Sequence, residues 1–382
     1  MKKRETFLSY GKQTIDEDDV AAVVGTLRSP FLTQGPKVEE FERAIADYVG
    51  AKYAVAFANG TAALHGACFA SGIMQGDEVI TTPITFAATA NAVLYCGGTP
   101  VFADINADTY NIDANEIPKK ITPQTKAVIP VDFTGQPVDL DAIMDVAKEN
   151  NLIVIEDGAH SLGATYKGRK VGSQAHMTMF SFHPVKPITT GEGGIITTNS
   201  KEYYEKLKLF RSHGITKTPY SIEQGDWYYE MTDLGFNYRM NDIQAALGLS
   251  QLKKLDGFLE RRREIADQYN DLLADVPGVI PPKQLEDTES GWHLFMIQLD
   301  ENVLSKTRRQ IFDEMRAANI GVHVHYIPVY WHPYYQELGY KRGQCLIAEK
   351  WYKQALTLPL HPKMTNEDVN FIIRILKNII GT

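Results

Sequence analysis

The chain has 382 residues, of which 44% are hydrophobic and 23% are charged, and its formal net charge is -8 at pH 7. This length exceeds the usual size of one hydrophobic core and predicts two domains. The acidic balance argues against a general role in binding nucleic acid or a membrane surface, because those partners favour concentrated lysine and arginine.

The cysteines and the N-terminus indicate a cytoplasmic protein. Cys68, Cys96 and Cys345 include no CxxC pair, so we expect reduced, buried thiols and neither a disulfide framework nor a zinc ribbon. The N-terminus has a basic start but no apolar stretch long enough for a signal peptide or a transmembrane helix.

Helix-like and strand-like segments alternate from about residue 37 to 200, which predicts a mostly parallel sheet covered by helices. Apolar residues at helical spacing predict a helix that ends at Val49, with Gly50 as its C-terminal cap. Further helices are predicted at 61–71, 86–95 and 140–150, and strands at 53–57, 78–81, 99–103, 127–131, 152–156, 177–181 and 195–198.

A long helical pattern from 241 to about 272 leads out of this region. The pair Pro281 and Pro282 then prevents any helix from continuing. Strands at 293–299 and 321–326, with helices at 307–319 and 366–380, predict a smaller α+β unit. We place the boundary near residue 255, which gives a large domain of residues 1–255 and a small domain of residues 256–382.

Lys186 lies between a short apolar strand and a glycine-rich turn, where a lysine can act as a nucleophile. Free lysine titrates near ~10.4, so such chemistry needs a site that lowers this pKa. Upstream, Asp157 and His160 follow a buried strand, and a carboxylate at the end of a buried strand needs a cationic partner. A protonated pyridine nitrogen would supply one, so the three side chains together suggest pyridoxal phosphate.

A phosphate cradle is predicted at Gly60, Thr61 and Ala62, because a turn between a strand and a helix presents backbone N–H groups and the positive end of the helix dipole. The alternative is a plain turn in which Thr61 caps the helix. Ser181 precedes Lys186 by five residues and can reach the same phosphate, or it can be a buried serine bonded internally.

Three other side chains have an ordinary alternative beside the functional one. Phe86 can lie flat on the pyridine ring or be a core aromatic. Asp157 can instead be a helix cap or a surface acid, and His160 can bond the cofactor ring or satisfy a local turn.

Competing motifs fail specific tests. No G-x-G-x-x-G follows a strand, no G-x-S-x-G surrounds a serine, and residues 163–170 match a P-loop only in glycine spacing. His323 and His325 would face the same side of a strand, but no third ligand is placed, so no metal is expected.

The sequence resembles the sugar aminotransferases of the DegT/DnrJ/EryC1/StrS family nearly from end to end. The motifs that carry this resemblance are GTA at 60–62, TPITF at 82–86, EDGAH at 156–160, SFHPVK at 181–186 and GFNYRMNDIQAA at 235–246. The resemblance implies an α/β fold of the pyridoxal-phosphate fold type I: a large domain with a mostly parallel mixed sheet and a smaller C-terminal α+β domain.

The family's cofactor-binding residues match this chain position by position. The resemblance implies that Lys186 is the Schiff-base lysine, that Asp157 contacts the pyridine nitrogen, and that Phe86 stacks on the ring. His160 stands near the ring hydroxyl, where the family often has glutamine. The residues that match phosphate contacts are Ser181 and the turn at Gly60, Thr61 and Ala62. Asn237 matches a residue that reaches the phosphate of the neighbouring subunit, so the resemblance implies a homodimer with composite sites.

Within the family, the segments 182–190, 209–214 and 324–330 are most similar to members that act on a UDP-linked sugar of the pseudaminic acid pathway. This implies transfer of an amino group from L-glutamate to C4 of a UDP-4-keto-6-deoxy-N-acetylhexosamine. In those members the nucleotide sugar is touched by the residues matching Tyr10, Pro30, Phe31, Leu32, Thr33, His325, Tyr326, Ile327 and Pro328.

Three alternatives accompany this interpretation. One is an aminotransferase for a GDP- or dTDP-linked keto sugar. Another is a pyridoxal-phosphate-dependent sugar dehydratase, although such dehydratases have histidine where this chain has Lys186. The third is a regulatory protein on the same scaffold, which normally carries an extra DNA-binding domain. The diphosphate needs cationic or backbone donors, for which Arg211 and Arg239 are candidates.

Overall fold

The computed structural model describes residues 3–381, and its largest element is a seven-stranded sheet. The order across the sheet is β1 (Tyr53–Phe57), β9 (Gly194–Thr198), β8 (Met177–Ser181), β5 (Ile153–Asp157), β4 (Thr125–Ile129), β2 (Glu78–Thr81) and β3 (Thr99–Phe102). Within this sheet β9 is antiparallel to both neighbours and the other pairs are parallel. The predicted mostly parallel mixed sheet is confirmed.

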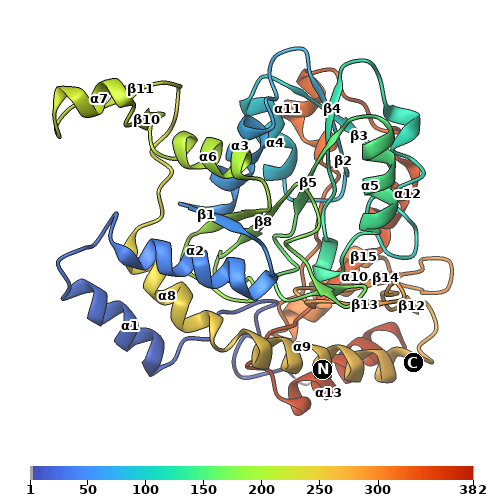
Figure 1. The fold of residues 1–382 in the computed structure, drawn as a ribbon. Helices are drawn as coiled ribbons and strands as arrows, with labels where there is room; N and C mark the ends of the chain where they lie inside the picture. The colour runs from blue at the N-terminus through green and yellow to red at the C-terminus, as the bar shows by residue number, and fades with distance from the viewer. Residues whose placement is uncertain (1–2, 382) are drawn as a thin grey trace.

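Helices cover both faces of this sheet (Figure 1). In β1, Val55 and Phe57 pack with one set of helices and Ala54 and Ala56 with the other, because successive strand side chains point to opposite faces. The first set is α3 (Gly60–Ala70), α4 (Ala88–Tyr95) and α6 (Lys201–Phe210). The second set is α2 (Pro36–Val49), α5 (Leu140–Glu149) and α8 (Asp242–Leu252).

The observed helix ends follow the chemistry of their caps. Gly50 ends α2 in the left-handed region at φ 75°, as predicted. The single helix predicted from 241 to 272 is observed as two helices. Lys253 and Lys254 lie between the end of α8 and the start of α9 (Leu255–Leu273). The strand predicted at 127–131 begins and ends two residues earlier, as β4.

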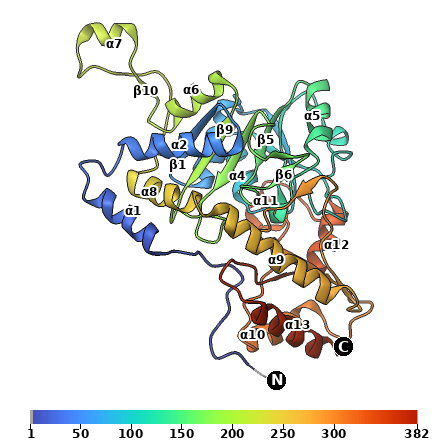
Figure 2. The same ribbon diagram turned by 60° about the horizontal axis from the view of Figure 1, so that its bottom comes forward.

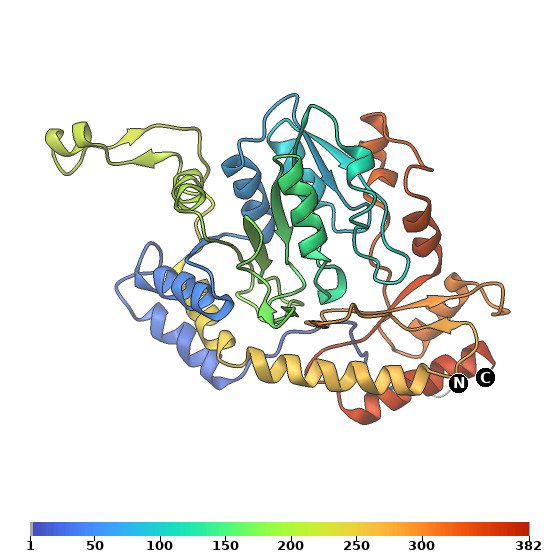
Figure 3. The same cartoon turned by 45° about the vertical axis from the view of Figure 1, so that its right-hand side comes forward.

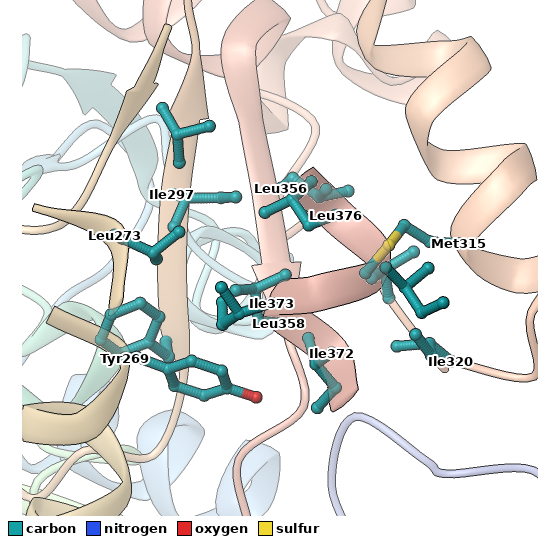
Figure 4. Close-up of a cluster of buried hydrophobic side chains, with 14 of the residues drawn as sticks. Tyr269, Leu273, Ile297, Met315, Ile320, Leu356, Leu358, Ile372, Ile373 and Leu376 are labelled. Atoms are coloured by element: carbon teal, nitrogen blue, oxygen red, sulfur yellow. The ribbon is translucent and has the colours of Figure 1, made fainter. Parts of the chain in front are cut away.

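The C-terminal part is a three-stranded antiparallel sheet with helices packed on it. The strands are β12 (Val279–Ile280), β14 (Phe295–Leu299) and β15 (Ala355–Leu358), and the helices are α9, α10 (Arg308–Ala317) and α13 (Asn366–Ile380). Figure 4 shows side chains of β14, β15 and α13 meeting in this core. Leu8 belongs to the same core, so the N-terminal segment packs here. The boundary near residue 255 coincides with the start of α9 and stays a prediction.

The strand predicted at 321–326 is wrong. Only a single bridge joins His323 to Thr357 of β15, a strand that the sequence analysis missed. The ladder stops there because the N–H of Val324 donates to Nδ1 of His323 at 2.8 Å, and such a local bond competes with strand pairing.

An arm between α6 and α8 projects from the body of the protein, as Figures 2 and 3 both show. It consists of β10 (Ile215–Thr216), α7 (Pro219–Gln224) and β11 (Glu230–Met231), with β10 and β11 paired antiparallel. Other elements outside the predictions are α1 (Glu17–Leu27), β6 (Thr165–Tyr166), β7 (Arg169–Lys170), β13 (Thr288–Glu289), α11 (Pro333–Glu337), α12 (Leu346–Gln354) and three short 3-10 turns at Pro118–Lys120, Phe133–Gly135 and Val329–Trp331.

The free cysteines match their prediction only in part, since Cys68 and Cys345 are buried but Cys96 is only partly buried. Within residues 3–381, no helix combines the length and the apolar composition that crossing a membrane requires.

The C-terminal core generates a stability prediction. Leu376 of α13 is fully buried there, so Leu376→Ala should lower the free energy of unfolding by about 2 to 5 kcal/mol through lost burial and a residual cavity. Urea unfolding followed by circular dichroism measures the change. The matched control is Leu346→Ala at an exposed position of α12, which should change it by less than about 0.5 kcal/mol. Equal losses in the two variants would contradict the assigned core.

Candidate active site

The site forms where the carboxyl ends of neighbouring strands meet the start of α3. Asp157 ends β5 and Ser181 ends β8, and Asp157 pairs with Met179 while Ser181 pairs with Gly194. A Cβ atom added to Gly60 would lie 3.2 Å from the Cβ of Ser181, so the helix start approaches β8 closely. Crevices at this end of an open α/β sheet are the usual ligand sites.

Asp157 is a buried carboxylate, 3% exposed. It accepts hydrogen bonds from Oγ1 of Thr89 at 2.7 Å and from the N–H of Ala159 at 3.1 Å. Burial raises the pKa of Asp157, while Thr89, Ala159 and the nearby Lys186 ammonium oppose this rise. The surface-acid alternative is therefore wrong, and the carboxylate stands ready for a cationic partner.

Thr89 is a site residue that the sequence analysis missed. It lies on the first turn of α4, three residues after Phe86, and also shares a 2.7 Å hydrogen bond with Thr85. Phe86 precedes α4 and is 62% exposed, whereas Thr89 is 1% exposed, so no regular spacing in the sequence pointed to Thr89.

Lys186 follows β8 on the loop that leads to the glycine-rich turn, and its side chain is partly buried. Burial lowers the pKa of the Lys186 ammonium from 10.5 to about 8, although the Asp157 carboxylate opposes this shift. A lysine with this pKa is a neutral amine near physiological pH far more often than a surface lysine, as a nucleophile requires.

Phe86 leaves 62% of its side chain exposed, which excludes the alternative of a core aromatic. Its ring centroid lies 6.2 Å from that of Tyr326. A large exposed aromatic beside buried polar groups fits a flat heteroaromatic ligand.

The start of α3 is capped by Asn59, whose side chain accepts from the N–H of Ala62 at 2.8 Å. The alternative in which Thr61 caps this helix is therefore wrong. The N–H groups of Gly60 and Thr61 belong to the first turn, where a helix offers no internal acceptor. Ser181 is only partly buried and accepts a long bond of 3.4 Å from the N–H of His183, so its hydroxyl proton is available for an anion.

His160 is buried, and its ring centroid lies 4.4 Å from that of His293, which the sequence analysis did not single out. Burial lowers the pKa of His160 well below its ordinary value, and Lys186 and His325 lower it further. Within residues 3–381 no hydrogen bond reaches its Nδ1 atom. The ring is therefore neutral, and its side chain does not satisfy the local turn through Nδ1.

Tyr10 and the segment 325–328 form a wall beside this cluster. The ring centroids of Tyr10 and His325 are 5.0 Å apart, and those of His325 and Tyr326 are 4.8 Å apart. Ile327 is exposed and Pro328 is buried. The N–H of the next residue, Val329, donates to the carbonyl of Pro83 at 2.9 Å. Tyr10, His325 and Tyr326 thus form one aromatic cluster that Ile327 and Pro328 continue along the chain, and their contact with a nucleotide sugar stays a prediction.

The other predicted site residues are exposed in the single chain. The exposed residues Pro30, Phe31, Leu32 and Thr33 follow α1, and the carbonyl of Leu32 accepts from the N–H of Asp242. Asn237 is exposed at the base of the projecting arm, bridged to Ser212.

Of the two candidate diphosphate ligands, Arg211 has a structural role, whereas Arg239 is partly buried and stays a candidate. Arg211 pairs with Glu42 and donates to the carbonyl of Ala56 at 2.7 Å, so it is a structural ion-pair residue. The rings of His323 and His325 are 4.5 Å apart. In the part of the chain that the structure describes, no group of three or more His, Cys, Asp or Glu side chains is placed to hold a metal ion.

The fold and this set of side chains define an aminotransferase. The chain belongs to the DegT/DnrJ/EryC1/StrS aminotransferase family, whose model matches residues 13–377. Over its full length it is 44% identical to the spore coat polysaccharide biosynthesis protein SpsC of Bacillus subtilis, covering 99% of that protein. It is 41% identical to the UDP-4-amino-4,6-dideoxy-N-acetyl-beta-L-altrosamine transaminase of Campylobacter jejuni, over 98% of this chain and 97% of that one.

Solved structures show the same fold along almost the whole chain. Helicobacter pylori PseC, an aminotransferase involved in the biosynthesis of pseudoaminic acid, superposes with a TM-score of 0.92 at 36% identity, over 98% of this chain and 100% of that one. The PLP form of the sugar aminotransferase Spr1654 from Streptococcus pneumoniae gives a TM-score of 0.92 at 32% identity, over 98% and 99%. The predicted fold type and family are confirmed.

The low pKa of Lys186 generates a titration experiment on the cofactor-free protein. After reductive methylation with 13C-formaldehyde, one lysine signal in the NMR spectrum should titrate near pH 8, because burial disfavours its protonated form. The signal should be missing in Lys186→Arg. In Asp157→Asn it should titrate at a lower pH, because the opposing carboxylate charge is gone. A Lys186 signal that titrates near 10.5 would contradict the assigned environment.

Proposed function

We propose that this protein is a UDP-4-amino-4,6-dideoxy-N-acetyl-β-L-altrosamine transaminase, which moves an amino group from L-glutamate to C4 of a UDP-4-keto-6-deoxy-N-acetylhexosamine in pseudaminic acid biosynthesis. The observation that carries the reaction type is the juxtaposition of Lys186 with the buried carboxylate of Asp157. The likeness to the Campylobacter jejuni transaminase and to PseC supports the choice of sugar. SpsC carries a different name at similar identity, so another nucleotide-linked keto sugar is the competing candidate.

The cofactor is pyridoxal 5'-phosphate. When bound, it supplies an aldehyde that exchanges amines and an electron-poor ring that takes up the electron pair of a broken C–H bond. We assign Lys186 to the aldehyde, Asp157 to the pyridine nitrogen, Phe86 to the ring face and His160 to the ring hydroxyl. The phosphate is assigned to Gly60, Thr61, Ala62 and Ser181.

The open features of the site match these assignments one by one. The exposed face of Phe86 receives a flat ring, and the carboxylate of Asp157 receives a cation. The uncapped N–H groups at Gly60 and Thr61 suit a phosphate at a helix start. The neutral ring of His160 can hydrogen-bond a hydroxyl without adding a positive charge beside Lys186.

Lys186 also moves protons in this proposal. Once the incoming amine has displaced it, its Nζ atom is a free amine that accepts the proton from Cα of glutamate. The same nitrogen delivers a proton to C4 of the sugar in the second half of the reaction. A pKa of about 8 suits both tasks, because a general base works best when its pKa is near the working pH.

We propose a second copy of this chain as the protein partner. The projecting arm exposes large apolar side chains, with Trp227 79%, Leu234 71% and Met231 65% exposed, and such a surface is typical of an interface. In the homodimer, Asn237 at the base of the arm and the exposed segment 30–33 would complete the partner's site. The exposure of these residues in the single chain supports this placement.

A panel of sugars tests the reaction. The purified protein with pyridoxal phosphate and L-glutamate should release 2-oxoglutarate with a UDP-4-keto-6-deoxy-N-acetylhexosamine, at a kcat/KM at least about tenfold above those for GDP- and dTDP-linked 4-keto-6-deoxy sugars. Lys186→Ala should abolish turnover. Release only with GDP- or dTDP-sugars would reject the proposed substrate and keep the reaction type, while failure with every sugar would reject both.

The arm tests the dimer. Trp227→Glu should shift the protein from dimer to monomer in light scattering coupled to size exclusion, because a charge would be buried in an apolar interface. Activity should fall in parallel. The control is Tyr334→Glu, at an aromatic residue of α11 that is 60% exposed. This variant should keep the molar mass of the dimer in solution. A monomeric wild-type protein with full activity would contradict the composite site.

A further inference from the structure

Thr357 of β15 is a buried threonine whose hydroxyl connects two side chains. Its Oγ1 atom lies 2.8 Å from Nδ1 of His325 and 2.7 Å from Sδ of Met296. All three residues are at most 4% exposed, so water does not replace these contacts. The sequence analysis placed His325 in the substrate wall but gave no role to Thr357.

The direction of these hydrogen bonds follows from what each atom can do. A thioether sulfur only accepts, and a threonine hydroxyl has one proton. The Thr357 proton therefore points to Met296, and Oγ1 accepts a proton from the neighbouring imidazole. This requires the proton of His325 to be on Nδ1.

The surroundings of His325 keep its ring neutral. Burial lowers the pKa of His325, and with the smaller effects of His323 and Lys186 this pKa falls to about 3. The titratable side chains around the ring are histidines, tyrosines and one lysine, with no carboxylate among them: His160, His293, His323, Tyr10, Tyr326 and Lys186. A neutral ring with its proton on Nδ1 has a lone pair on Nε2, the nitrogen on the opposite edge.

We propose that Thr357 is a positioning residue that fixes His325 as the Nδ1–H tautomer, so that Nε2 accepts a hydrogen bond from a hydroxyl or amide N–H of the sugar. The identity of that donor rests on the proposed function. In this role His325 does not bind the diphosphate, because an unprotonated acceptor repels phosphate oxygens.

The backbone holds this arrangement in place. The N–H of Thr357 donates to the carbonyl of His323 at 2.8 Å, and the N–H of His323 donates back at 3.2 Å. Met296 stands directly opposite Thr357 in the β14–β15 pair. The hydroxyl is thus fixed by two neighbouring chain segments, and the rings of Tyr10, His323 and Tyr326 pack around His325.

Nitrogen NMR on the protein with 15N-labelled histidine tests the tautomer without any substrate. His325, assigned by its loss in His325→Gln, should show a protonated Nδ1 and an unprotonated Nε2 at pH 7. Thr357→Val, which keeps the shape but removes the hydroxyl, should shift this pattern toward the Nε2–H form, and Thr357→Ser should retain it. A wild-type ring with Nε2–H, a doubly protonated ring, or no change in Thr357→Val would overturn the inference.

The two half-reactions of the holoenzyme provide an independent readout. Thr357→Val should slow the reaction of the aminated cofactor with the sugar by about tenfold, the effect of one lost hydrogen bond of ~1.4 kcal/mol. The reaction with glutamate should change by less than about twofold, and Thr357→Ser should restore the sugar step. Equal losses in both half-reactions would overturn the assignment to the sugar. If no sugar reacts with the wild-type enzyme, the proposed function fails while the NMR result still decides the tautomer.

Discussion

The site depends on keeping an ammonium group and a carboxylate in a partly dry crevice at the ends of parallel strands. Burial disfavours the charge of both Lys186 and Asp157, while each stabilises the charge of the other. The balance of these effects leaves the Lys186 amine with a pKa of about 8. Near this pH the amine is present both in its neutral, nucleophilic form and in its protonated form. The sheet provides this balance, because β5 and β8 are adjacent and end at the same edge.

The neutral histidines have the same physical origin. His160, His293 and His325 are buried beside Lys186, and each has a pKa lowered mainly by burial. Three positive rings would repel the ammonium form of Lys186 and would compete with it for anionic ligands. Neutral rings instead present directional donors and acceptors, so their tautomers matter more than their charge.

Most of the large sheet could be predicted from the sequence, because its strands are apolar runs separated by clear turns. Lys186, Asp157 and Phe86 were singled out by residue type and position in a strand or turn, and their cofactor contacts stay predictions. Thr89 and Thr357 were missed, because their importance depends on which side chain their hydroxyls reach across the fold. The strand predicted at 321–326 was wrong for the same reason. The N–H of Val324 donates to Nδ1 of His323, and a pattern of apolar and polar residues does not reveal such a bond.

The packing of Leu8 has a consequence for how the protein matures on the ribosome. Leu8 exchanges hydrogen bonds with Asn319 and Gly321, and the carbonyl of Tyr10 accepts from the N–H of Leu360. Leu8 and Tyr10 therefore meet these partners only after residues 319–360 have been synthesised. Since Tyr10 packs beside His325, this aromatic wall needs the C-terminal part of the chain to be complete, even though the large sheet is built from earlier residues.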